Sequence, residues 1–101
     1  MKHHLSNMKI THKQLQSQLE DLFKLFGYKY YFTWKSYHSP PGYPDYTATR
    51  GNRTIWVELK TVGDKLKPAQ EEWHRVLKEN PNNEVYLIYP DDIESLAKIL
   101  K

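Results

Sequence analysis

The sequence predicts an α/β protein in which a mixed β-sheet is flanked by helices, with the element order α-β-β-β-α-β-α. Three observations support this prediction. Apolar residues recur at helical spacing in two separate segments. Two strand-like segments meet at a Gly51-Asn52 pair, which favours a tight hairpin. A short, nearly continuous apolar segment after the second helix is expected in a sheet covered on both faces.

The first elements are expected to be a helix, a strand and a loop. Residues 11–26 predict an amphipathic helix that ends at Gly27. Its apolar positions are Leu15, Leu19, Leu22, Phe23 and Phe26. Residues 28–34 are rich in aromatic side chains and predict a strand. Residues 35–42 contain two prolines and predict a loop.

The second half predicts two strands, a helix, a strand and a final helix. Residues 43–49 and 53–61 are the strands of the hairpin. Pro68 suits the first turn of a helix that runs to about residue 80. We expect its apolar stripe to use Ala69, Trp73, Val76 and Leu77. Residues 84–89 predict a strand, and residues 93–100 a last helix.

Composition bounds the kind of protein. A chain of 101 residues allows one domain with one modest core, here residues 11–101, after a tail or expression remnant at residues 1–10. The absence of cysteine excludes disulfides and thiolate metal sites and suits a cytoplasmic location. No apolar run approaches the ~18 residues of a membrane span, so no membrane partner is expected. The net charge of +3 leans toward a polyanionic partner.

The hairpin brings two acids together. If Gly51 and Asn52 form the turn, cross-strand partners have residue numbers that sum to 103, and Asp45 faces Glu58. Strand side chains alternate, so Lys60 shares the face of these acids. The opposite face is the predicted core face and carries Tyr46, Ala48, Ile55, Val57 and Leu59. A one-residue slip in register would separate the acids.

Facing carboxylates need a cation or a raised pKa. Their Cβ atoms would lie roughly 4.5–5.5 Å apart, where like charges destabilise the pair. Hard oxygen ligands at this separation suit Mg²⁺ or Mn²⁺ together with phosphate oxygens, and Lys60 adds a positive charge beside them. The alternative is a solvent-facing strand on which Glu58 and Lys60 form a weak exposed pair.

These residues resemble the PD-(D/E)xK nuclease signature, with Pro44-Asp45 followed by Glu58-Leu59-Lys60. The predicted element order is also that of the restriction-endonuclease-like core. Gly42 before an aromatic residue and a proline, together with the later KPAQEEWHRVL, is similar to the small VRR-NUC (virus-type replication-repair nuclease) domains. The resemblance extends over residues 11 to about 100.

The resemblance implies roles for individual residues. Asp45, Glu58 and the backbone carbonyl of Leu59 would ligate Mg²⁺ or Mn²⁺, and Lys60 would act on the attacking water. Gln70 matches a glutamine that supports the active site, although it could equally be an exposed polar residue of a helix.

The sequence departs from the family pattern at the first helix. The family usually has a glutamate in a stretch like TEKQ, whereas this chain has THKQ with His12 in that place. An imidazole can ligate Mn²⁺ better than Mg²⁺. Otherwise His12 is a solvated residue at a helix end, and Gln16 and Glu20 could partly compensate for the missing acid.

Several basic residues are candidates for contact with nucleic acid. His38 lies in the loop before the site and could contact phosphate. The others flank the predicted strands and are Lys35, Arg50, Arg53, Lys65 and Lys67. Each alone is also an ordinary surface charge. His74 has no partner at metal-ligand spacing, which favours a structural role.

The predicted function is that of a metal-dependent, structure-selective DNA endonuclease, similar to Holliday-junction resolvases, in phage or bacterial replication, recombination or repair. One active site cuts one strand, so cleavage of a junction calls for a homodimer; no small-molecule substrate is expected. The rivals are a non-catalytic nucleic-acid-binding module, which His12 favours, and a sequence-specific restriction-type nuclease. A purely structural protein would leave the facing acids unexplained.

Overall fold

The fold is a four-stranded sheet with helices on both faces. The computed structural model describes residues 9–35 and 37–101, so the predicted tail lies mostly outside the described residues. The elements are α2 (His12–Leu25), β1 (Lys29–Phe32), β2 (Tyr46–Arg50), β3 (Arg53–Leu59), α3 (Pro68–Lys78), β4 (Glu84–Ile88), the 3₁₀ turn η1 (Pro90–Asp92) and α4 (Ile93–Leu100). The predicted order is confirmed, with η1 added before the last helix.

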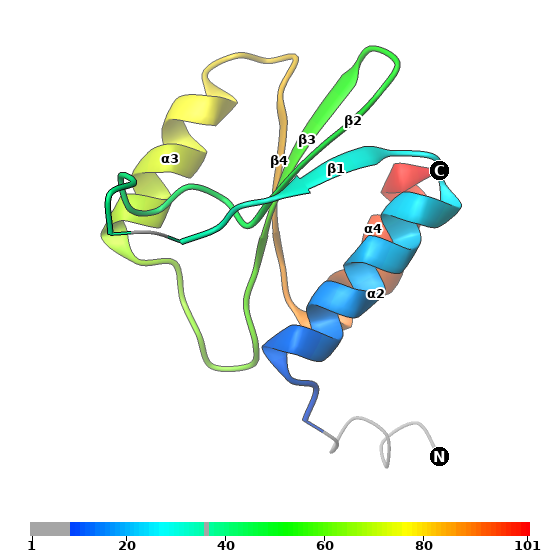
Figure 1. The fold of residues 1–101 in the computed structure, drawn as a ribbon, viewed down its shortest axis with the longest axis horizontal. Coiled ribbons are helices and arrows are strands. Elements are labelled where there is room, and N and C mark those ends of the chain that lie inside the picture. Colours follow the sequence, from blue (N-terminus) through cyan, green and yellow to red (C-terminus); the bar gives the residue numbers. More distant parts are fainter. Residues whose placement is uncertain (1–8, 36) are drawn as a thin grey trace.

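The sheet is mixed, as predicted. Its strand order is β1-β2-β3-β4, with β1, β2 and β3 antiparallel and β4 parallel to β3. A parallel pair needs a crossover, and α3 supplies it. Helix α3 lies on one side of the sheet, and α2 and α4 lie on the other (Figure 1). None of the helices in the described residues is long and apolar enough to span a membrane.

The hairpin has the predicted register. Arg50 pairs with Arg53 and Thr47 with Trp56, so the turn is Gly51-Asn52. Gly51 has φ +58°, which glycine adopts without the cost that a side chain would bring. The ladder between β2 and β3 begins at Tyr46, three residues later than predicted.

The core lies between the sheet and the pair α2 and α4. All five residues of the predicted core face are buried, together with Leu15, Leu19 and Phe23 of α2 and Leu96 and Leu100 of α4. Leu22 and Phe26 pack against this cluster, which confirms the apolar face of the first helix. The periodic apolar residues of the first helix therefore correctly predicted the side of that helix that packs against the sheet.

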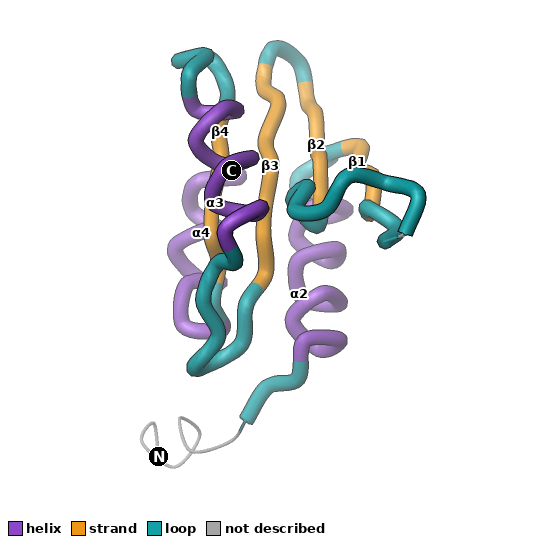
Figure 2. The backbone as a smooth tube through the Cα atoms, turned by 90° about the vertical axis from the view of Figure 1, so that its left-hand side faces the viewer, coloured by secondary structure: helices purple, strands orange, loops and turns teal. Residues whose placement is uncertain are grey.

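The predicted stripe of α3 is partly wrong. Val76 is 41% exposed, and the buried residues of this helix are Gln70 and His74. The reason is that α3 covers the sheet face that carries the acids, so polar side chains point inward. Viewed from this side, α3 lies in front of β3 and β4 and the loop between β1 and β2 lies beside it (Figure 2).

Candidate active site

Asp45 and Glu58 lie at the end of the hairpin opposite its turn. Asp45 directly precedes β2, and Glu58 is the second-last residue of β3. The side chains are 3% and 2% exposed, and that of Lys60 is 12% exposed. The alternative of a solvent-facing strand with an exposed Glu58–Lys60 pair is therefore wrong, because α3 covers this face.

Asp45 is fixed by backbone contacts on both sides. Its Oδ2 accepts a 2.8 Å hydrogen bond from the backbone N–H of Leu59. On the other side, Thr33 donates its backbone N–H to the Asp45 carbonyl (2.8 Å) and its hydroxyl to the Pro44 carbonyl (2.7 Å). These bonds continue the pairing beyond β1 and β3 and hold the carboxylate in one position.

Glu58 is a buried carboxylate with one oxygen left over. Its Oε2 accepts a 3.1 Å hydrogen bond from Gln70 Nε2 and lies 3.8 Å from Lys60 Nζ. Its Oε1 is buried and has no hydrogen-bond partner among the described residues. Burial, and next the charge of Asp45, raise the pKa of Glu58 to about 7, although Lys60 and Lys35 oppose the shift.

Gln70 connects the acid to the start of α3. Its Oε1 accepts a 2.8 Å hydrogen bond from the backbone N–H of Lys67, and this bond caps the N-terminus of the helix. This bond leaves Nε2 as the group that donates to Glu58. Gln70 is 6% exposed, so the interpretation as an exposed polar residue is wrong. Its supporting role in catalysis stays a prediction.

His12 begins α2 and reaches the same site from the other side of the sheet. Thr11 caps this helix through a 3.1 Å bond from the Gln14 N–H to its hydroxyl oxygen. His12 Nε2 lies 3.2 Å from the Leu59 carbonyl oxygen and 3.7 Å from Asp45 Oδ2. His12 thus stands beside two of the predicted ligands, and because a carbonyl only accepts, the bond to Leu59 requires a proton on Nε2.

Glu20 does not reach this site. Its Oε2 accepts a hydrogen bond from the Tyr46 hydroxyl and its Oε1 one from Tyr30 at 3.3 Å, both on the core face of the sheet. Burial and the bond to Glu20 raise the pKa of Tyr46. The suggestion that Glu20 compensates for the missing helix acid is therefore wrong.

The donor set suits a hard divalent cation. Among the described residues, no group of three His, Cys, Asp or Glu side chains converges in a way that could hold a metal ion. Mg²⁺ and Mn²⁺ do not need such a group, since they take one or two carboxylates and fill the remaining positions with water and phosphate. The Asp45 carboxylate, the Glu58 carboxylate with its unpaired Oε1, and the Leu59 carbonyl fit this requirement.

Folding stability should depend on pH through Glu58. In the unfolded chain its pKa returns to about 4.5, so the folded chain binds more protons between pH 4.5 and about 7. The stabilisation by this proton is complete below pH 4.5 and is lost as the pH rises through 7. Glu58→Gln does not lose this stabilisation. Between pH 5 and pH 8, the free energy of unfolding of Glu58→Gln should therefore rise by about 1–3 kcal/mol relative to that of wild type, as measured by urea unfolding in EDTA.

The matched control for this prediction is Glu72→Gln on the exposed side of α3. The bond from Arg75 lowers the pKa of Glu72, so its loss should bring no such gain at pH 8. An equal stability difference between Glu58→Gln and wild type at both pH values would contradict the assignment of a raised pKa.

The predicted basic residues fall into two groups. Lys35 and Lys67 line a groove next to the acids, and Lys65 is exposed in the loop after β3. The ring of His38 lies 4.1 Å from that of Tyr37 in the exposed loop after β1. For these four residues, contact with nucleic acid stays a prediction.

Arg50 and Arg53 instead tie the hairpin to the C-terminus. Arg50 donates to the carbonyls of Phe26 (2.8 Å) and Leu100 (3.1 Å). Arg53 forms two bonds to Glu84 (2.8 and 2.7 Å) and donates to the Tyr28 hydroxyl. Both lie at the turn end of the hairpin, far along the strands from the acids, and several of their donors are used in these bonds. For these two residues as well, contact with nucleic acid stays a prediction.

The groove beside the acids was not predicted from the sequence. It has a volume of about 870 Å³ and lies between the loop after β1 and the start of α3. We call it the aromatic groove after its aromatic side chains, which are Tyr31, Trp34, Tyr37, Tyr43 and Trp73. Gln70 also lines it, so the groove opens next to Glu58. The concentration of aromatic residues at positions 28–43 was the available signal, but a strand also explains it.

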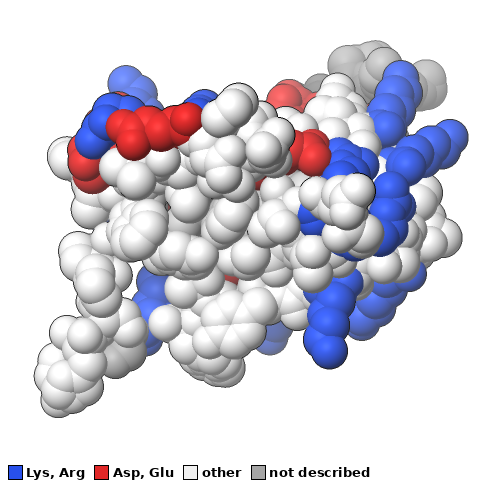
Figure 3. Space-filling view, turned by 90° about the horizontal axis from the view of Figure 1, so that it is seen from above, with Lys and Arg blue, Asp and Glu red and all other residues white. Residues whose placement is uncertain are grey.

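Charge on the rest of the surface is unevenly distributed. Seen from above, Lys and Arg gather on the right-hand side, where Figure 1 places α2 and α4, while acidic and basic side chains interleave on the left (Figure 3). On α3, Arg75 pairs with Glu72 (2.6 Å) and Glu79 (2.8 Å). The basic side is that of α2 and α4, whereas α3 covers the acids from the other face, so the basic residues next to the acids have to be considered individually.

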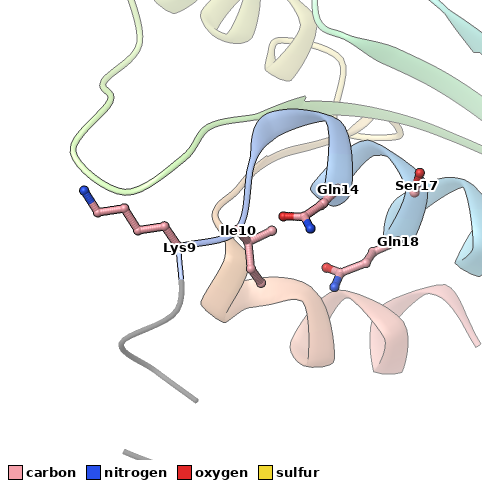
Figure 4. Close-up of a pocket in the computed structure, with 5 residues that line it drawn as sticks. All are labelled: Lys9, Ile10, Gln14, Ser17 and Gln18. Atoms are coloured by element: carbon pink, nitrogen blue, oxygen red, sulfur yellow. The ribbon is translucent and has the colours of Figure 1, made fainter. Parts of the chain in front are cut away.

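A second hollow, of about 350 Å³, lies on α2. Lys9 and Ile10 precede the helix there, and Gln14, Ser17 and Gln18 project from it (Figure 4). These three helix positions lie roughly 120° or more around the axis from His12, so they face away from the acids. None of the described residues that line the hollow is acidic, and we assign no chemistry to it.

Comparisons with known proteins support the fold. No protein-family model and no curated protein matches the chain. Among solved structures, the chain is similar to Hjc from Archaeoglobus fulgidus, a Holliday junction resolvase from an archaeal hyperthermophile. The TM-score is 0.57 at 19% sequence identity, and the match covers 77% of this chain and 69% of that one. The predicted α/β fold class is confirmed, since the mixed sheet flanked by helices matches that nuclease fold.

Proposed function

We propose that this protein is a divalent-metal-dependent DNA endonuclease that cuts branched DNA. The observation that carries the proposal is the pair of buried acids, Asp45 and Glu58, with Lys60 beside them at the end of one hairpin. Burying two carboxylates beside a partly buried lysine is costly for a small domain, and a catalytic site explains why they are there.

The residues of the site have separate tasks. Asp45, Glu58 and the Leu59 carbonyl would hold Mg²⁺ or Mn²⁺, which when bound activates water and neutralises charge on a phosphodiester. Lys60 would stabilise the negative charge that develops on the phosphate, since its ammonium group lies on the same face as the acids. Gln70 would keep Glu58 in place through its 3.1 Å bond.

The preference for branched DNA draws on two sources. The fold is similar to that of a Holliday junction resolvase, and Gly42 before an aromatic residue and a proline, together with the later KPAQEEWHRVL, resembles VRR-NUC domains. A single site cuts one strand at a time, so we propose a homodimer for the cleavage of a four-way junction. A restriction-type nuclease is less well supported, because the helices and strands of the described residues all belong to the one sheet-and-helix domain.

Cleavage of a set of labelled DNA substrates tests the proposal. Four-way, flapped, linear double-stranded and single-stranded DNA are incubated with Mn²⁺, Mg²⁺ or EDTA. We expect metal-dependent cleavage of the branched substrates and no cleavage by Glu58→Ala prepared in the same way. Equal cleavage by wild type and Glu58→Ala would refute the nuclease function.

A second function, a DNA-binding module without catalysis, is favoured by one observation. His12 Nε2 stands beside both the Leu59 carbonyl and Asp45 Oδ2, where a metal-binding site would need free oxygen atoms. In that case the protein binds branched DNA but does not cut it, whichever metal ion is added. His12→Glu, which restores the family acid, would then show whether this one side chain suppresses cleavage.

A further inference from the structure

The aromatic groove presents large apolar side chains to solvent beside the proposed active site. Trp34 is 75% exposed, Tyr37 93% and Tyr31 63%. Exposed aromatic residues that cluster on one surface usually mark a site of interaction. The groove therefore suits a ligand whose chemistry matches flat, apolar and partly polar rings.

One wall of the groove is rigid. The rings of Tyr43 and Trp73 meet edge to face at 4.9 Å, and Trp73 Nε1 donates to the Pro41 carbonyl at 3.2 Å. The Tyr43 hydroxyl accepts a 2.8 Å bond from Trp56 Nε1. These contacts hold the loop against α3 and form this wall of the groove.

The charges in and next to the groove favour an anionic chain. Lys35 and Lys67 line it, and none of the described residues that line it is acidic. Lys35 is close enough to the acids to lower the pKa of Glu58. Gln70 lines the groove and donates to Glu58, so a chain of phosphates that follows the two lysines ends at the proposed active site.

We propose that the aromatic groove binds unpaired nucleotides of the DNA substrate, with bases stacked on Trp34 and its neighbours. The faces of bases in a duplex are covered by other bases, whereas unpaired bases can stack on aromatic side chains. The lysines then contact the phosphates between those bases. This inference rests on the proposed nuclease function and adds to it, among branched DNAs, a preference for substrates with a single-stranded segment, such as a flap.

Binding measured in EDTA tests the groove separately from cleavage. Fluorescence anisotropy compares labelled oligothymidylate and a flapped DNA with a blunt duplex, using wild type, Trp34→Leu and Trp34→Phe. We expect Trp34→Leu to bind the oligothymidylate and the flap about tenfold more weakly, with less than a twofold change for the duplex. Trp34→Phe keeps an aromatic face and should retain most of the affinity.

The control variant is Leu25→Ala, which removes an exposed apolar side chain (72% exposed) from α2, outside the groove. It should bind all three DNAs as wild type does. Equal weakening toward duplex and single-stranded DNA, or equal behaviour of Trp34→Leu and Trp34→Phe, would overturn the inference. So would conversion of a dimer into a monomer by Trp34→Leu in light scattering, because a second copy of the chain would then cover the groove.

The outcomes separate this inference from the nuclease proposal. If wild type cleaves branched DNA and Trp34→Leu binds the flap like wild type, the inference about the groove fails alone. If wild type cuts nothing but the stacking pattern holds, the nuclease function fails and the groove is that of a binding module.

Discussion

Replacing Lys60 with methionine should lower the rate of DNA cleavage by about 10²–10³-fold. The ammonium group lies 3.8 Å from Glu58 Oε2, and its side chain is only 12% exposed, so little water screens its charge. Methionine keeps most of the length of the side chain and removes the charge. The measurement is single-turnover cleavage of the best branched substrate in Mn²⁺, with the protein in excess over the DNA.

Lys65→Met is the matched control for Lys60→Met. Lys65 lies five residues further along the chain and is exposed, so its loss should weaken DNA binding slightly and leave the rate of the bound complex unchanged. If both variants lose the same small amount of activity, Lys60 acts only as a general positive charge. Binding of the flap in EDTA by Lys60→Met verifies that the folded protein is still present.

Replacing Gly42 with alanine should cost about 2–4 kcal/mol of the free energy of unfolding. Gly42 has φ +94°, and a Cβ atom there would lie 2.5 Å from the backbone carbon and oxygen of Ala69. Because Ala69 belongs to the first turn of α3, the clash cannot be relieved by rotating a side chain. The loop and the helix have to move apart, which disturbs the next residue, Gln70, and the bond that this residue donates to Glu58.

Gly63→Ala separates strain from the clash. Gly63 has φ +92°, but none of the described residues outside its immediate neighbours has an atom within 4 Å of the added Cβ. It should lose only the ~1–2 kcal/mol that a side chain costs in this backbone region. Urea unfolding measures both variants, and an equal loss would show that the close approach of the loop to α3 contributes nothing.

The hairpin and its acids were predictable because their geometry is local. A two-residue turn at Gly51-Asn52 sets the register, and strand alternation then assigns each face. Periodicity likewise identified the helix that covers the core. The same method failed on α3, since a helix over a polar site buries Gln70 and His74 rather than Val76.

Contacts between distant segments could not be predicted in this way. The arginines of the hairpin look like any surface charge in the sequence, but Arg50 bonds to Leu100 and Arg53 to Ile99. Nothing near either arginine in the sequence indicates that the last helix ends beside it. The proximity of His12 to Leu59, 47 residues away, is of the same kind, and only the resemblance to a family drew attention to His12.

The amide of Gln70 would also link the two proposed binding events, that of a cation at Glu58 and that of DNA in the aromatic groove. It is bound at one end by the backbone that starts α3 and at the other by Glu58, and the same start of α3 lines the aromatic groove. A ligand in the groove that shifts the first turn of α3 would change the hydrogen bond from Gln70 to Glu58 and so the free energy of cation binding at that carboxylate. By thermodynamic reciprocity, a cation held at Glu58 changes the affinity of the groove by the same factor. DNA and metal should therefore bind cooperatively, with a coupling that Gln70→Ala reduces.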